Sequence, residues 1–114
     1  MKMTKEELAA KLEAHAKWLK TRYTGHVEGE RADLTRADLM DANLMDADLM
    51  DADLTRADLT DANLTRADLT DANLTCANIE HVWSASTLVL DAISATFSAR
   101  MALKKTRVEW EHNR

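Results

Sequence analysis

The stretch ADLTRADLTDANLTRADLTDANLT, residues 52–75, decides the fold, because it places a leucine at every fifth position. An α-helix turns by about 100° per residue, so a five-residue step spreads the leucines around all sides of the helix. In a β-strand an odd step sends successive leucines to opposite faces. Neither regular element buries this pattern on one face. The chain must therefore bend once in every five residues.

Each unit, such as Ala-Asp-Leu-Thr-Arg, predicts three residues that alternate like a strand, followed by two that turn a corner. Alanine and leucine then point inward, and the residue between them points outward. Ten consecutive units, residues 32–81, wind into a tube filled with leucine and alanine. Neighbouring coils lie roughly 4.8 Å apart. The expected core is the central residue of each unit: Leu34, Leu39, Leu44, Leu49, Leu54, Leu59, Leu64, Leu69, Leu74 and Ile79.

Comparison of the chain with itself predicts the cross-section of the tube. Residues 32–51 and 52–71 differ at four positions only, whereas residues 32–56 and 47–71 differ at ten of twenty-five. A twenty-residue period favours a square tube with four units per coil over a triangular one. Ten units make two and a half coils, and a solenoid this short needs a cap at each end.

The run A-[DN]-L-X-X resembles the pentapeptide repeat family, over ten consecutive units that cover 50 of 114 residues. The resemblance implies a β-solenoid, a right-handed quadrilateral β-helix of about two and a half to three coils. It also implies that the leucines and Ile79 point inward, with the alanines from Ala32 to Ala77 as the smaller inward residues. Two features depart from the family: the last position, often glycine, is Arg or Asp in eight of the ten units, and the central residue is never Phe. The close identity between coils fits recent duplication or a consensus design, and both remain open.

The flanks divide the chain into three segments. Residues 1–26 form an N-terminal capping helix, residues 27–81 the β-helix, and residues 82–114 a C-terminal capping and oligomerisation segment. The first segment reads as an amphipathic helix from Met1 to about Tyr23 that Gly25 stops. Thr4 and Glu7 match a capping box at its start. Leu8, Leu12, His15 and Leu19 share one helical face.

The C-terminal segment carries more apolar side chains than one end of a square tube requires. An apolar patch of that size is uncommon on a soluble monomer, so we expect a homodimer through this segment. Helical spacing is favoured there, while its β-branched residues leave degenerate strands open. The candidate dimer interface consists of Leu90, Ile93, Phe97 and Met101.

The net charge of −5 is unevenly distributed, because residues 32–79 hold eleven aspartates and only three arginines. This charge argues against direct binding of nucleic acid and favours a partner with a basic surface. The opening residues lack the apolar core of a signal peptide, and no segment approaches the length of a membrane span. Cys76 is alone, so it forms no internal disulfide. We expect a cytoplasmic protein without a membrane partner.

No catalytic constellation is visible, because the four histidines are scattered without partner spacing. We therefore expect no enzyme activity, no cofactor and no metal site. The outward acidic residues are more informative. A twenty-residue coil sets Asp41 beside Asp61 and Asp51 beside Asp71, and these four aspartates form the candidate acidic binding surface.

Two functions follow from this surface. The favoured one is a non-enzymatic binding or scaffold protein that presents a rigid acidic β-helical surface to a protein partner. The alternative is a DNA mimic that inhibits or protects a DNA-binding enzyme such as gyrase, because some pentapeptide repeat proteins resemble B-form DNA in width and charge. A basic DNA-handling enzyme is the partner class to watch. Met40, Met45 and Met50 also point outward, either as a contact surface, as neighbours of residues 20–31, or as tolerated surface residues.

Overall fold

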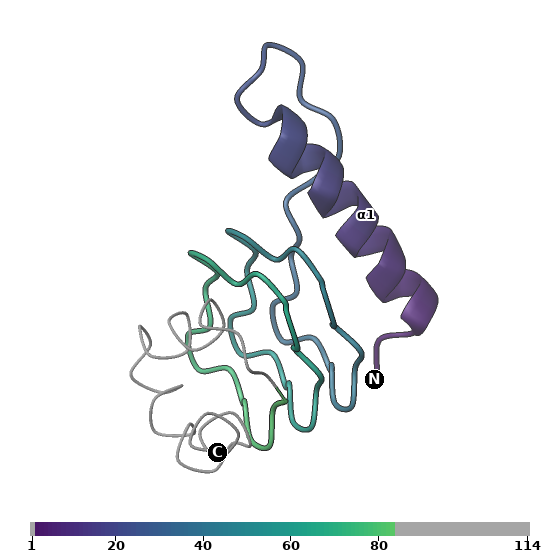
Figure 1. Cartoon of the computed structure of the whole chain (residues 1–114), viewed down its shortest axis with the longest axis vertical. Coiled ribbons are helices and arrows are strands. Elements are labelled where there is room, and N and C mark those ends of the chain that lie inside the picture. The colour runs from purple at the N-terminus through teal and green to yellow at the C-terminus, as the bar shows by residue number, and fades with distance from the viewer. Residues whose placement is uncertain (1, 84–114) are drawn as a thin grey trace.

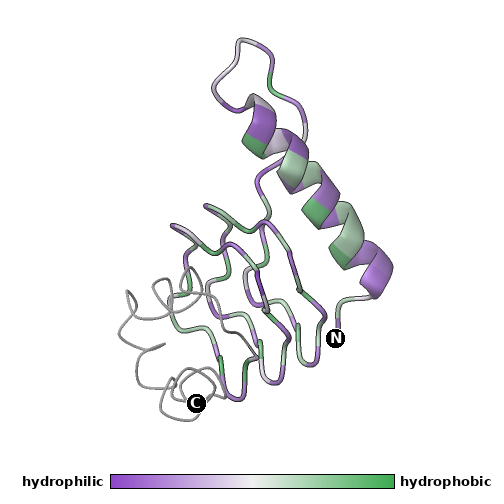
Figure 2. Cartoon of the chain, in the orientation of Figure 1, coloured by the Kyte–Doolittle hydropathy of each residue, from purple (hydrophilic) through white to green (hydrophobic). Residues whose placement is uncertain are grey.

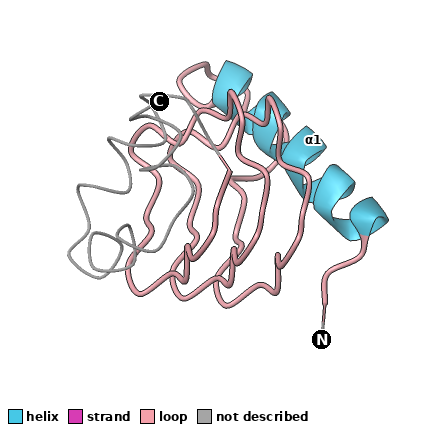
Figure 3. Cartoon of the chain, turned by 60° about the horizontal axis from the view of Figure 1, so that its bottom comes forward, coloured by secondary structure: helices cyan, strands magenta, loops and turns pink. Residues whose placement is uncertain are grey.

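The computed structural model describes residues 2–83 and consists of one helix packed against a stack of coils (Figure 1). Helix α1 (Lys5–Thr21) is the only helix in this part of the chain. The repeats follow it as stacked turns, with α1 along one end of the stack (Figure 3). Of the predicted C-terminal segment, Val82 and Trp83 alone are described. The residues proposed there for a dimer interface (Leu90, Ile93, Phe97 and Met101) lie outside the described residues.

Hydrogen bonds between coils give the period of the stack. Parallel bridges join residues twenty positions apart, as between Asp33 and Asp53 and between Asp53 and Asn73. The Leu54 amide donates to the carbonyl oxygen of Asn73 at 2.8 Å, and the Asp53 amide donates to that of Ala32 at 3.1 Å. One coil therefore takes twenty residues, or four pentapeptides. The handedness of the coil stays a prediction.

The strand-like stretch predicted in each unit is shorter in the structure than expected. Residues 2–83 contain isolated bridge residues and no extended strand. The reason is the corner, because the Ala57 amide donates back to the carbonyl oxygen of Leu54 at 3.0 Å and closes a turn. Because every unit contains a turn, only one residue of each unit forms β-bridges, the Asp or Asn before the leucine. In the middle coil this residue bridges to both neighbouring coils, as Asp53 does to Asp33 and Asn73.

The last residue of every unit lies in the left-handed region of backbone conformation. All ten have φ between 57° and 63°, although none is glycine. This conformation disfavours L-residues by about 1–2 kcal/mol each, with Asn and Asp the best tolerated after glycine. A positive φ at the third turn position is typical of a type II turn. The hydrogen bonds between coils offset the strain, since the Arg56 amide donates to the carbonyl oxygen of Thr75 at 2.9 Å.

The Asp or Asn of each unit also supports the corner with its side chain. Asp53 Oδ1 accepts the Thr55 amide at 3.0 Å and the Thr55 hydroxyl at 2.6 Å. Asn63 Oδ1 accepts the same two donors from Thr65. This is the Asx turn that short polar side chains form with the backbone two residues on. The residue predicted to be merely outward and polar is therefore part of the turn.

The interior of the coil is filled as the repeat predicts. The central leucines and Ile79 are all 1% exposed or less. Figure 2 shows apolar and polar residues alternating along each coil. Burial of each leucine contributes about 1.5–3 kcal/mol. The alanines are less uniform, because Ala52, Ala57, Ala62 and Ala67 are fully buried while Ala37, Ala42, Ala47 and Ala72 are partly exposed.

Helix α1 begins later than predicted, at Lys5 and not at Met1. The capping box is present, with the Glu7 amide 3.0 Å from Thr4 Oγ1 and the Thr4 amide 3.3 Å from Glu7 Oε1. Residues before the cap extend the coil instead. Lys2 forms a parallel bridge with Asp38, whose carbonyl oxygen accepts the Met3 amide at 3.3 Å. Leu8 joins the core of the coil and Leu12 packs against it.

The prediction that Gly25 stops the helix is wrong. Helix α1 ends four residues earlier, at Thr21, whose hydroxyl donates to Lys17 and accepts the Glu28 amide at 2.8 Å. Gly25 has open space around its Cα. The required glycine is Gly29, with φ of 75°. A Cβ there would lie 2.1 Å from the carbonyl oxygen of Ala14. Gly29 therefore lets the returning chain approach the helix.

We predict that Gly29→Ala lowers the free energy of unfolding by about 2 kcal/mol or more, through a clash with helix backbone and a strained φ. Gly25→Ala is the matched control, because its methyl group would meet no atom, and it should change stability by less than about 1 kcal/mol. Urea denaturation of the three proteins measures both values. Equal midpoints for the two variants would show that the close approach at Gly29 is not required.

Candidate binding surface on the coil corners

The outward side chains at the turns form four columns that run along the stack, which we name after their residues. Successive coils are in register there, since the Asp41 amide donates to the carbonyl oxygen of Thr60 at 2.9 Å. The Arg corner holds Arg36, Arg56 and Cys76, the Asp41 corner Asp41, Asp61 and His81, the mixed corner Asp46 and Arg66, and the Asp51 corner Asp51 and Asp71. One column is thus basic, one is mixed and two are acidic.

The mixed corner neutralises itself. Arg66 Nε donates to Asp46 Oδ1 at 2.7 Å, and a terminal nitrogen of the same guanidinium donates to Oδ2 at 3.1 Å. This two-point contact lowers the pKa of the Asp46 carboxyl and raises the pKa of Arg66. The pair joins neighbouring coils across twenty residues. It leaves little charge at this corner for a partner.

The Asp51 corner is partly covered by the N-terminal segment. The Arg22 guanidinium pairs with the Asp51 carboxylate, and Arg31 Nε donates to the Asp51 carbonyl oxygen at 2.6 Å. The guanidinium carbon of Arg22 lies 4.9 Å from the centre of the Trp18 ring and 4.7 Å from the centre of the Tyr23 ring. These two rings hold the Arg22 side chain in place. Asp51 is thus occupied within the chain. Asp71, one coil further, is exposed and forms no ion pair within residues 2–83.

The Asp41 corner is more open. Lys2 Nζ lies 3.9 Å from Asp41 Oδ2, with both side chains more than half exposed. A contact of that length between exposed groups holds little energy. Asp61 is half-buried and has no ion pair in the described part of the chain. Within residues 2–83 the four predicted aspartates therefore differ: Asp51 is paired, Asp41 is loosely paired, and Asp61 and Asp71 have no ion pair.

The three outward methionines of the first coil differ in their surroundings. Met40 and Met45 are exposed, at 37% and 41%. Met50 is half-buried, and its sulfur lies 3.8 Å from a terminal nitrogen of Arg22. Met50 thus contacts residues 20–31, one of the alternatives that the sequence leaves open. The other two remain surface residues of the coil.

His15 connects the helix to the coil through both ring nitrogens. Its Nδ1 accepts the Ala32 amide at 2.9 Å, so Nε2 carries the proton and donates to the carbonyl oxygen of Met50, also at 2.9 Å. The ring is fully buried and stacks on Trp18 with centroids 5.6 Å apart. The sequence placed His15 on the apolar face of the helix. Its partners, 17 and 35 residues away, left no local signal.

We predict that His15→Leu destabilises the protein by about 2–4 kcal/mol, because it leaves a buried amide and a buried carbonyl without partners. His26→Leu removes the same ring from an exposed loop and should change stability by less than about 0.5 kcal/mol. Thermal unfolding followed by circular dichroism compares them. A His15→Leu variant as stable as the parent would contradict the role of these two hydrogen bonds.

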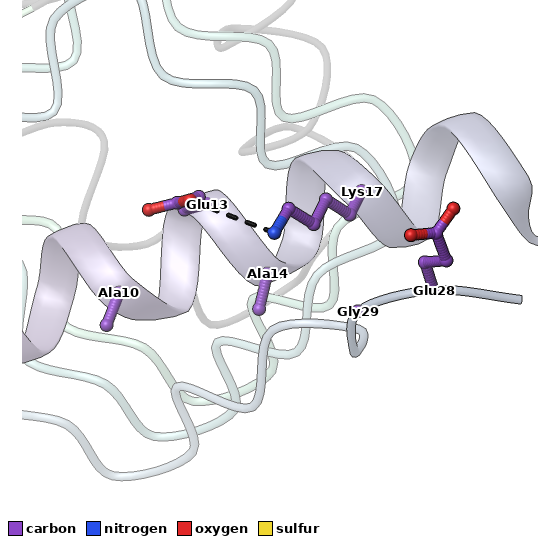
Figure 4. Close-up of a pocket in the computed structure, with 6 residues that line it drawn as sticks. All are labelled: Ala10, Glu13, Ala14, Lys17, Glu28 and Gly29. Carbon is purple, nitrogen blue, oxygen red and sulfur yellow. Dashed lines mark ion pairs between the residues drawn. The ribbon is translucent and has the colours of Figure 1, made fainter.

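A shallow pocket of about 300 Å³ lies between α1 and the returning chain at Glu28 and Gly29 (Figure 4). Its walls are two alanines and the exposed pair of Glu13 and Lys17, whose charged atoms are 3.9 Å apart. Within residues 2–83 no three His, Cys, Asp or Glu side chains are placed to hold a metal ion. In the same range no helix has the length and apolar character to cross a bilayer.

Comparison with known proteins agrees with the repeat geometry. The family profile described as pentapeptide repeats matches residues 30–56 and 52–83, in eight copies. The repeat segment of this chain belongs to the pentapeptide repeat family. No curated protein and no solved structure matches the chain significantly. The pentapeptide repeat coil, with its four corners, is therefore the feature on which a functional argument can rest.

Two Asx turns of the pentapeptide repeat coil lower the pKa of their aspartates, Asp33 and Asp53. The Thr55 hydroxyl and amide lower the pKa of Asp53, and the Thr35 side chain and amide lower that of Asp33. A carboxyl whose pKa is lowered on folding stabilises the protein above its unfolded pKa of about 3.9. That contribution is lost as the pH falls through the lower, folded pKa. These turns therefore weaken under acid conditions.

We predict that the melting temperature falls below about pH 4, and that Asp53→Asn makes this fall shallower. Asparagine retains both hydrogen bonds, as Asn63 shows, but does not titrate. At pH 7 the variant should melt close to the parent, whereas Asp53→Ala, which loses the acceptor, should be less stable at every pH. Melting curves from pH 7 to about pH 2.5 test this. Parallel pH profiles for parent and Asp53→Asn would rule out the Asx contribution.

Proposed function

We propose that this protein is a non-enzymatic binding scaffold that presents the acidic corners of its pentapeptide repeat coil to a basic protein partner. The observation that supports this most is the state of Asp61 and Asp71. Both belong to corners whose first two positions are aspartates, and neither has an ion pair within residues 2–83. Carboxylates without an ion-pair partner among the described residues are available to arginine and lysine side chains of another protein.

The backbone fixes the positions from which these two side chains leave the coil. Asp61 and Asp71 have φ of 62° and 59°, a narrow region for a residue other than glycine. The Asp61 amide donates to the carbonyl oxygen of Glu80 at 3.0 Å, which ties the corner to the next coil. A partner that binds this surface therefore does not have to order a flexible loop. Such preorganisation lowers the entropic penalty of binding.

The surroundings of both corners extend the acidic surface. Asp58 and Asp68 stand on the sides that lead into these corners, and they accept hydrogen bonds from the threonines two residues on. Residues 32–79 hold eleven aspartates against three arginines, one of which is paired internally. A field of one sign over a rigid surface accelerates encounter with a partner of the opposite sign.

We predict that Asp61→Asn/Asp71→Asn weakens binding to a partner about tenfold at physiological salt. The partner is first captured from the native host by immobilised protein and identified by mass spectrometry. Its dissociation constant for each variant is then measured with purified components. The matched control, Glu6→Gln/Glu13→Gln, removes the same charge from exposed positions of α1.

The control should bind like the parent, and binding by the parent should weaken as salt is raised, since exposed charges are screened. Equal weakening by the two double variants would mean that net charge alone matters and that the corners are not the site. Undiminished binding by Asp61→Asn/Asp71→Asn would place the contact elsewhere on the chain.

A DNA mimic is the second function that the corner geometry favours. Two of four columns consist of aspartates in their first two coils, at the roughly 4.8 Å spacing of paired strands. Duplex DNA carries one charge per about 1.7 Å of axis, so two acidic columns approach that density without matching it. A supercoiling assay with gyrase separates the two functions. If the parent inhibits gyrase and the Asp61→Asn/Asp71→Asn variant does not, the result favours DNA mimicry over the scaffold function.

We infer the remaining architecture from the family. The coil is right-handed and quadrilateral, with residues 1–26 and 82–114 as its two caps. The homodimer through the C-terminal segment remains a proposal, because its interface residues are outside the described part of the chain. A dimer would double the number of acidic corners available to one partner and so increase avidity.

A further inference from the structure

A groove of about 460 Å³ runs along the end of the coil beside α1. One wall is the N-terminal segment with Met3, Leu8 and Leu12, and the other is the first coil around Leu39 and Ala42. Its volume falls in the range of ligand pockets, about 300–1,000 Å³. Ala42 is partly exposed there, whereas its equivalent one coil further, Ala62, is fully buried. The cap therefore leaves this part of the coil interior open.

The backbone beside the groove forms the outer edge of the first coil. Within residues 2–83 neither the amide nor the carbonyl oxygen of Asn43 has a hydrogen-bond partner. In the next coil both groups of Asn63 are used, because its amide donates to Ala42 and its carbonyl oxygen accepts the Leu44 amide. Asn43 is also exposed. An edge of this kind is a template for pairing with another extended chain.

The chain already pairs in this way on the neighbouring side of the coil. Lys2 forms a parallel bridge with Asp38, and the Met3 amide donates to the Asp38 carbonyl oxygen at 3.3 Å. Asp38 and Asn43 hold the same position in consecutive units. The groove continues from Asp38 to Asn43 around the corner at Asp41. The coil edge at Asn43 is therefore equivalent to the edge at Asp38, which the N-terminal segment already occupies through Lys2.

We propose that this groove binds a single extended peptide segment, which pairs in parallel with Asn43 and places a small or apolar side chain over Ala42. Recognition is by addition of a strand, in which main-chain hydrogen bonds supply affinity and alternate side chains supply specificity. The segment resembles one unit of the repeat, small-polar-leucine, because such a unit would continue the stack. At the rim, Lys5 has no ion pair among the described residues and suits an acidic side chain.

The dimensions of the site favour a peptide over a second copy of the coil. Helix α1 covers this end on the side of Ala32, which is 3% exposed and whose amide is bonded to His15. A twenty-residue coil cannot stack on an end that a helix already covers, whereas one extended segment fits beside that helix. Peptide binding in this groove is separate from the scaffold function proposed above, because neither Asp61 nor Asp71 lines the groove.

The probe is the synthetic peptide acetyl-ADLTDANLTR-amide, which copies residues 57–66. It is titrated into the ¹⁵N-labelled full-length chain. We expect the Asn43 amide to shift and its hydrogen exchange to slow at least about tenfold at saturation, as for a newly hydrogen-bonded amide. The same peptide with both leucines replaced by aspartate, or with the main-chain nitrogen of both leucines methylated, should bind at least about tenfold more weakly.

Two tryptophan variants test the location. Ala9 lines the groove and Ala10 does not, although both are exposed residues in the middle of α1. Ala9→Trp should weaken peptide binding at least about tenfold, while Ala10→Trp should leave it within about twofold. No shift at Asn43 with about 1 mM peptide, or equal binding by both variants, overturns the proposal. Protection of the Asn43 amide that rises with protein concentration in the absence of peptide would assign the edge to a second copy, and would overturn it too.

Discussion

The left-handed backbone conformation at every fifth residue is the constraint on which the rest of this structure depends. Because the turn closes there, the residue two positions before it always points into the coil, and the leucines meet at the centre. Because the turn recurs four times in twenty residues, each coil returns to the register of the previous one. The Asp or Asn side chain of the same unit then bonds the turn from outside. One local conformation thus produces core, period and surface together.

The end of such a coil exposes main-chain amides and carbonyl oxygens as well as leucine side chains. The N-terminal cap therefore needs both apolar and hydrogen-bonding groups. Helix α1 supplies Leu8 for the apolar part. Two of the carbonyl oxygens at the edge accept hydrogen bonds from the N-terminal segment: that of Asp38 from the Met3 amide, and that of Met50 from His15. A purely apolar helix would leave the Met50 carbonyl oxygen without its partner, at about 1–3 kcal/mol. The buried face of the cap therefore contains a hydrogen-bonding histidine among its leucines.

The corner side chains are free to vary because they contribute little to the core. Arg, Asp, Cys and His all occupy the same conformation in this chain. Their chemistry is thus available for interaction, and their placement decides which charges remain unpaired. Arg66 neutralises Asp46 and Arg22 occupies Asp51, while Asp61 and Asp71 form no ion pair within residues 2–83. An acidic surface predicted as four equal aspartates is therefore, in the folded chain, a surface with two principal positions.

The amino-acid sequence by itself determined the coil. The five-residue spacing of leucine, the twenty-residue period and the capping box at Thr4 depend on local geometry and on repetition, and both are visible in one dimension. The tertiary structure alone decided where α1 lies across the coil end. From that placement follow the later start of the helix, the need for glycine at Gly29, and the groove beside Asn43. The physical reason is separation along the chain: the contacts that dock the helix, from His15 and Arg22, join residues 17 to 35 positions apart, and no local pattern encodes them.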